Sequence, residues 1–123
     1  LRAQKGVWPA ADPKYLEWIR TQPCVVCAML WRQGLTHEDS IRASEDRVLT
    51  RHQSSPTEAA HVGLRGSGQT CSDREAIPLC RAHHRRGEPG GHHDLGKRFW
   101  IVYSLERYAV IGELNELYDR EVV

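Results

Sequence analysis

The chain has 123 residues, which is enough for one domain with a modest hydrophobic core. Its formal net charge is +1, from 17 Lys and Arg residues against 16 Asp and Glu residues, so overall charge alone does not predict nucleic-acid binding. The apolar runs are far shorter than the roughly 18 residues that a membrane-spanning helix needs, so no association with a membrane is expected.

The first predicted element is a helix over residues 13–22. Asp12 is a favoured N-cap residue, and Pro13 is favoured at the first helical position. Pro23 ends the helix because proline cannot continue its hydrogen-bond pattern. Residues 1–22 are therefore expected to form an N-terminal helical arm.

A pair of cysteines and a long polar stretch follow the arm. Cys24-Val25-Val26-Cys27 predicts two thiols turned toward each other on a tight turn. Residues 29–56 begin apolar, become polar with mixed charge, and end in Ser54-Ser55-Pro56, which is typical of a loop. We expect this stretch to be an insertion, and whether it holds a short helix around residues 38–50 stays open.

Short elements are expected in the middle of the chain. Residues 57–63 (TEAAHVG) form an apolar run that ends in glycine, which predicts a strand with His61 near its end. The three glycines of residues 63–68 indicate a tight loop. The apolar residues 76–79 lead into the next cysteine, and residues 81–87 indicate a short helix.

The C-terminal part is expected to be helical. From Asp94 onward, apolar residues recur at helical spacing and predict two helices that pack on the core. Ser104 is the expected N-cap of the second helix, although Arg107 stands where a complete capping box has Glu. Residues 94–123 are thus predicted to form C-terminal helices.

The spacing of the cysteines favours a metal site. Cys24-x-x-Cys27 and Cys80-x-x-His83 are two short chelating pairs, and together they supply the four ligands that a structural Zn²⁺ takes. A disulfide framework is disfavoured because one of the four is a histidine, which cannot form a disulfide. Cys71 is left over and is expected to be an ordinary loop residue. This chemistry favours a cytoplasmic location.

A second group of polar residues surrounds the glycine-rich loop. Between His61 and Arg98, seven Lys and Arg residues stand against four Asp and Glu residues. Any one histidine here could have a purely structural role, but the set supplies a base for water, ligands for a cation and positive charge for a phosphate backbone. Its members are His61, Asp73, Glu75, His84, His92 and His93.

These motifs resemble the HNH nucleases. The similar segments are "EAAHV", the glycine loop, "SD", "IPLCRAHH" and "HHDLG", and the nearest relatives resemble phage recombination-enhancing nucleases. The resemblance covers residues 23–99 and is most specific in the Cys-x-x-His-His run joined to the upstream Cys-x-x-Cys. It implies an α+β fold: one domain over residues 1–123, with a zinc-stapled ββα-metal core at residues 57–93 and flanking helices.

The resemblance also implies residue roles. His61 resembles the general base that activates water, and His84 resembles a ligand of a catalytic Mg²⁺ or Mn²⁺. Ala60 departs from the family, which commonly has Asp or His as a metal ligand directly before the base. The residues that could replace this ligand or complete the metal set are Glu58, Asp73, Glu75 and His93.

The function expected from this reading is metal-dependent endonuclease activity, with DNA as the favoured substrate. Arg65, Arg85 and Arg86 are candidates for contacts with the nucleic-acid backbone. One alternative, supported by Ala60, is a zinc-stapled module that binds nucleic acid without cutting it. Another is a structural zinc domain that docks a partner protein through residues 29–56. A protein partner or a homodimer could also add affinity.

Overall fold

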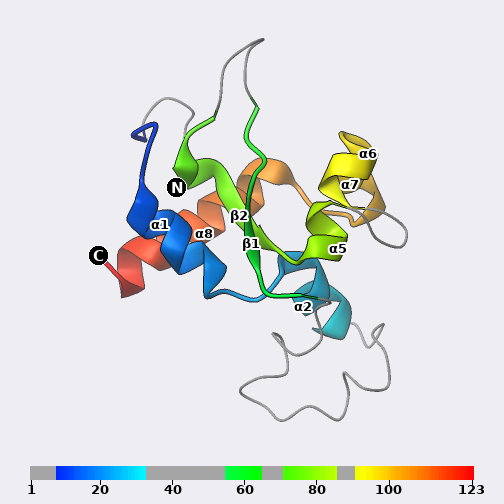
Figure 1. Ribbon diagram of the computed structural model, residues 1–123, viewed down its shortest axis with the longest axis horizontal. Coiled ribbons are helices and arrows are strands. Elements are labelled where there is room, and N and C mark those ends of the chain that lie inside the picture. Colours follow the sequence, from blue (N-terminus) through cyan, green and yellow to red (C-terminus); the bar gives the residue numbers. More distant parts are fainter. Residues whose placement is uncertain (1–7, 33–54, 65–70, 86–90) are drawn as a thin grey trace.

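The computed structural model describes residues 8–32, 55–64, 71–85 and 91–123. These residues form a small α+β fold in which a two-stranded sheet packs against helices (Figure 1). In chain order the elements are α1 (Pro13–Arg20), α2 (Val25–Arg32), β1 (Glu58–His61), the 3-10 turn η2 (Asp73–Glu75), β2 (Ala76–Leu79), α5 (Arg81–His84), α6 (His92–Leu95), α7 (Arg98–Val102) and α8 (Arg107–Glu121).

The sheet consists of β1 and β2 in antiparallel register. Glu58 pairs with Leu79 at one end and His61 pairs with Ala76 at the other, which confirms the predicted strand around His61. Every residue of β2 is buried. Helices α1 and α5 each contact both strands, from opposite sides in the view of Figure 1, and α2 and α8 contact β2.

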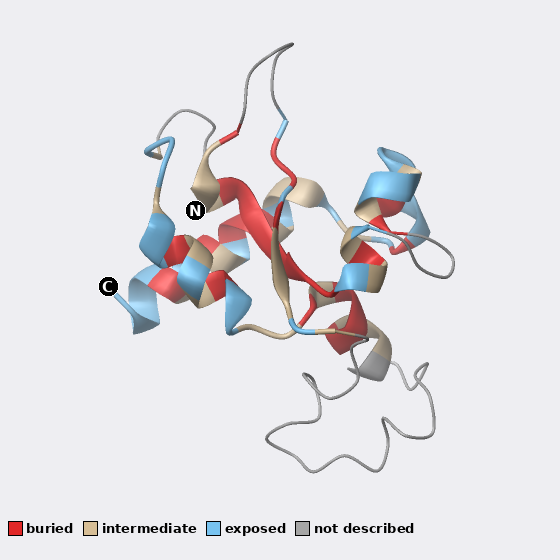
Figure 2. Ribbon diagram, viewed as in Figure 1, coloured by how far each residue is buried: buried red, intermediate tan, exposed pale blue. Residues whose placement is uncertain are grey.

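The buried side chains form one main cluster and one smaller cluster. The main cluster joins the sheet to α2, α7 and α8, and its largest members include Phe99, Ile77 and Ile111 (Figure 2). The smaller cluster lies between α1 and α8, where the Tyr15 and Tyr118 rings meet edge to face at 4.9 Å. The two terminal helices are therefore held to each other as well as to the sheet.

The caps of the terminal helices agree with the sequence at one end and differ at the other. Asp12 caps α1 as predicted, because its carboxylate accepts from the Tyr15 amide. The predicted cap Ser104 is wrong: it has a left-handed φ of 55° in the turn that follows α7. Glu106 caps α8 instead, and its carboxylate accepts from the Ala109 amide at 2.8 Å.

Several predicted boundaries shift in the structure. Helix α2 starts within the Cys-x-x-Cys motif and continues to Arg32, so the first residues of the predicted insertion belong to a helix. Residues 33–54 of the insertion, which include the possible helix around residues 38–50, lie outside the described residues. In the C-terminal part, α7 and α8 are the two predicted helices, and the short α6 precedes them. Within the described residues, no helix combines the length and apolar character needed to cross a membrane.

Gly63, two residues after the end of β1, leaves no room for a side chain. A Cβ atom added at Gly63 would lie 2.3 Å from Oε1 and 2.8 Å from Cβ of the buried Glu75. We predict that Gly63→Ala lowers the free energy of unfolding by about 2–3 kcal/mol, because a packed interior must then shift. Urea unfolding monitored by circular dichroism measures this loss.

Gly96 shows the opposite case. An added Cβ there has no heavy atom within 4 Å, but the backbone has φ 56° and ψ −128°, so Gly96→Ala is strained by its backbone alone, at about 1–3 kcal/mol. A loss below about 1 kcal/mol at Gly63 would contradict the close packing against Glu75.

Candidate metal centre and neighbouring histidine pairs

Two helix starts bring four metal-ligating side chains together. Cys24 directly precedes α2 and Cys27 lies in its first turn, while Cys80 caps α5 and His83 lies within it. All four are buried, with Cys24 and Cys80 fully inaccessible. The tight turn predicted for the first cysteine pair is thus the beginning of a helix. Cys71 is also buried, but it does not belong to this group.

The four ligand atoms have the spacing of a tetrahedral zinc site. They lie within 4.8 Å of one another. The Cys27 and Cys80 sulfurs are 3.7 Å apart, and each is 3.4 Å from Nδ1 of His83. Zinc bonds of about 2.3 Å to sulfur and about 2.0 Å to nitrogen give tetrahedral edges of about 3.5–3.8 Å. The Cys₃His group therefore fits a structural Zn²⁺, as the sequence predicts.

The pKa values of the four side chains determine which protons a metal ion must displace. Hydrogen bonds from the Cys24 and Cys27 thiols lower the pKa of Cys80, so one thiolate forms readily. Burial lowers the pKa of His83, but hydrogen bonds to the Cys24 and Cys80 sulfurs outweigh burial and raise it to about 9. A zinc ion needs thiolates and a neutral imidazole, so its binding releases protons and weakens as the pH falls.

The group also connects distant parts of the chain. Cys24 and His83 are 59 positions apart in the sequence. The His83 ring packs edge to face on Tyr103 at 5.5 Å, which joins the group to α7 and the main core. A metal held here would fasten α2, the end of β2 and the C-terminal part together.

A first histidine–carboxylate pair lies at the end of β1. Nε2 of His61 is 2.8 Å from Oδ1 of Asp73, and the other oxygen, Oδ2, accepts from the Asp12 amide at 2.8 Å. Burial raises the pKa of Asp73, but the Asp12 amide and the imidazole outweigh burial and lower it. Asp73 is therefore ionised at neutral pH and can only accept, so Nε2 of His61 is the nitrogen that carries the proton.

A second pair lies at the start of β1. Nδ1 of His84 is 2.8 Å from Oε1 of Glu58, and Nε of the exposed Arg85 is 3.3 Å from the same oxygen. The His93 ring meets the His84 ring at a centroid distance of 4.6 Å. Burial, followed by the charges of His84 and Arg85, lowers the pKa of His93, which favours its neutral form. His84, His93 and Glu58 thus form a polar cluster beside α5.

The two pairs occupy opposite ends of the same strand. Glu58 and His61 are three residues apart on β1, which corresponds to about 10 Å along a strand. Because side chains alternate between the two faces, Glu58 shares its face with Ala60. Ala60 is buried in the main core and carries no ligand atom, so Glu58 is the residue on this face of β1 that carries a carboxylate.

Other predicted site residues lie elsewhere. Glu75 is buried away from the histidines, and its Oε2 accepts from the Tyr108 hydroxyl at 3.3 Å. His92 packs against Phe99 and Trp100, and its ring also lies 6.2 Å from the His93 ring. Arg65 and Arg86 lie outside the described residues.

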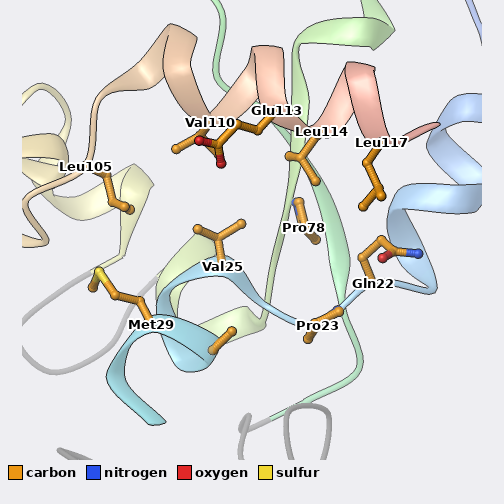
Figure 3. A pocket seen from close by; sticks show the side chains of 11 residues that line it. Gln22, Pro23, Val25, Met29, Pro78, Leu105, Val110, Glu113, Leu114 and Leu117 are labelled. Carbon is orange, nitrogen blue, oxygen red and sulfur yellow. The ribbon is translucent and has the colours of Figure 1, made fainter. Parts of the chain in front are cut away.

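A pocket of about 320 Å³ lies between α2, α8 and the sheet, apart from the histidines (Figure 3). Its lining is mainly apolar, and its polar members are Gln22 and Glu113. Its lining holds no His, Lys or Arg side chain, so it offers neither an imidazole base nor a cation for a phosphate.

Removal of one zinc ligand tests the metal centre. We predict that Cys24→Ser loses the one zinc per chain expected of the wild type, and that its free energy of unfolding falls by several kcal/mol. The reason is that structural zinc contributes about 10–16 kcal/mol of binding energy in zinc-finger peptides. Elemental analysis and urea unfolding measure the two effects.

Cys71→Ser is the matched control, because it changes a buried cysteine outside the group and should keep the zinc. Equal zinc content in the two variants would contradict the assignment.

Comparison with protein-family models, with curated proteins and with solved structures finds no match. The geometry therefore carries the assignment. It comprises a buried Cys₃His group beside a two-stranded sheet and helices, which fits a zinc-stapled α+β domain.

Proposed function

We propose that the chain is a metal-dependent phosphodiesterase of the HNH type that cuts nucleic acid, with DNA as the favoured substrate. One observation carries the proposal: two histidines are each paired with a carboxylate at 2.8 Å, His61 with Asp73 at the end of β1, and His84 of α5 with Glu58 at the start of β1. Each carboxylate fixes the orientation of its imidazole, as in many hydrolytic sites.

His61 fits the role of the general base. Asp73 accepts a hydrogen bond from the N–H at Nε2, so Nδ1 of a neutral His61 is left to accept a proton from water. The side chain is 37% exposed, which lets water and a substrate reach it. The activated water forms a bond to phosphorus as the bond to the 3′ oxygen breaks, which gives a 5′-phosphate and a 3′-hydroxyl end.

His84 and His93 fit the role of ligands for a catalytic cation. Glu58 takes Nδ1 of His84, so Nε2 is the nitrogen that would bind the ion, and the carboxylate acts as the outer partner that fixes the ring. Such an ion supplies charge that stabilises the phosphate and the leaving oxygen. Imidazole donors suit Mn²⁺ better than Mg²⁺, which prefers oxygen.

Arg85 fits a contact with the phosphate backbone. Its side chain is half exposed and its ion pair with Glu58 is at the surface, where exposed pairs contribute only about 0–1 kcal/mol. The guanidinium can therefore exchange Glu58 for a phosphate at little cost. This contact would place the backbone next to His84.

A zinc-stapled module that binds nucleic acid without cutting it is the second candidate. Ala60 favours it, since the buried alanine leaves no ligand at the position where HNH enzymes commonly have one. Binding to DNA in gel shifts, with no cleavage of plasmid or single strands under Mn²⁺ or Mg²⁺, would establish this candidate and refute the nuclease.

Replacement of the proposed base tests the mechanism. We predict that His61→Ala cleaves supercoiled plasmid at least about 100-fold more slowly than the wild type, because general base catalysis contributes about 10²–10⁴-fold. The variant should keep its zinc and its fold, since His61 lies outside the Cys₃His group. Equal rates of wild type and variant would exclude His61 as the base.

Metal dependence tests the second histidine pair. With the zinc retained, cleavage should require an added divalent ion and should be faster with Mn²⁺ than with Mg²⁺ at equal concentration. His84→Ala should be inactive with either added ion. Elemental analysis should show that this variant still contains its zinc. Full activity of zinc-loaded protein without an added ion would contradict a catalytic cation at His84.

A further inference from the structure

The side chain next to Asp73 connects three parts of the chain. Arg74 is largely buried, and its guanidinium donates from Nε to Asp12 at 2.7 Å and from Nη1 to Asn115 at 3.0 Å. It also reaches Asp119 at 3.3 Å. It lies between two aromatic rings of α1 and α8, 4.9 Å from the centroid of Tyr15 and 4.8 Å from that of Tyr118.

These contacts fix the beginning of α1 against the 3-10 turn η2. The Asp12 carboxylate accepts from Arg74 and from the Tyr15 amide, while the Asp12 backbone amide donates to Asp73. The Asp73 amide in turn donates to Ala10 at 3.1 Å. Asp12 therefore has two roles: its carboxylate binds Arg74, and its backbone amide binds the carboxylate of Asp73.

The last link of this chain of contacts is the imidazole at the end of β1. Asp73 has two oxygens: Oδ2 is occupied by the Asp12 amide, and Oδ1 contacts Nε2 of His61. If the Asp12 amide moved away, the carboxylate could rotate about its own bond and the contact with His61 would lose its fixed direction. The imidazole could then place its proton on either nitrogen.

We propose that Arg74 and Asp12 are positioning residues for His61: they fasten α1 to η2 so that Asp73 holds the proton on Nε2 and leaves Nδ1 open to water. The inference rests on the proposed function only for its catalytic consequence, because the tautomer of His61 can be measured without a substrate. It places α1 and α8, which lie outside the ββα core, among the requirements of the candidate site.

The charges around His61 and Asp73 are consistent with this role. Asp73 faces His61 from η2, and Arg20 of α1 adds positive charge near Asp73. Arg74 and Asp12 compensate each other by their ion pair. The position of the proton on His61 therefore depends mainly on how the Asp73 carboxylate is oriented.

The test compares Arg74→Met and Asp12→Asn with the control Asp119→Asn, each in the zinc-loaded 123-residue chain. Arg74→Met keeps most of the hydrocarbon part of the side chain and removes the positive charge and the guanidinium hydrogen-bond donors. Asp12→Asn keeps a side chain that caps α1 and weakens only the contact with Arg74. Asp119 is the exposed end of the same network, with a 58% exposed side chain, so its replacement leaves the Asp12 contact in place.

Two-bond ¹H–¹⁵N spectra of the imidazoles report which nitrogen of His61 is protonated. We expect the wild type and Asp119→Asn to show the Nε2 tautomer, and Arg74→Met and Asp12→Asn to show a mixture. We also expect kcat for DNA cleavage to fall at least about tenfold in these two variants, with KM nearly unchanged, because the base and not the substrate contact is disturbed.

The outcomes separate this inference from the proposed function. A pure Nε2 tautomer with wild-type kcat in folded Arg74→Met and Asp12→Asn would overturn the positioning role. Should Arg74→Met fail to fold, Asp12→Asn alone decides in the same way. A wild type that cuts no nucleic acid would overturn the nuclease, while the spectra would still decide whether Arg74 and Asp12 fix the tautomer.

Discussion

The structure depends above all on the buried Cys₃His group. Three sulfurs and an imidazole nitrogen lie within 4.8 Å of one another in the core, and without a cation they would be four polar side chains removed from water. With zinc, the same side chains join two helix starts that are more than fifty residues apart. A chain of this size can bury only a modest apolar core, and such a link adds stability that the core alone would not provide.

The position of the candidate metal ligand His84 depends on the Cys₃His group. Two strands of four residues are too short to be stable alone, so the hairpin needs the clamp at its end. His84 follows the ligand His83 on α5, and neighbouring helical positions point about 100° apart. One imidazole therefore faces the metal group, whereas the next reaches Glu58 on β1. The Cys₃His group fixes the position of α5 and thereby also the position of His84 beside Glu58.

Local sequence patterns predicted the elements whose causes are local. The Cys-x-x-Cys and Cys-x-x-His spacings predicted the metal group, Asp12-Pro13 predicted the start of α1, and the apolar run around His61 predicted β1. The choice between the two carboxylates near the "SD" motif could not be made in this way. It depends on the 3-10 turn, which directs Asp73 to His61 and buries Glu75.

Contacts between remote segments explain what the sequence could not reveal. Arg74 and Asp12 are 62 positions apart, and nothing in either neighbourhood marks them as partners. They meet where the tyrosines of α1 and α8 pack together, because the guanidinium lies against both rings. The contact between His84 and Glu58 joins α5 to β1, next to the Cys₃His group. The contact between His61 and Asp73 is connected through Asp12 and Arg74 to both terminal helices, so the candidate base and the candidate metal ligand are held by different parts of the fold.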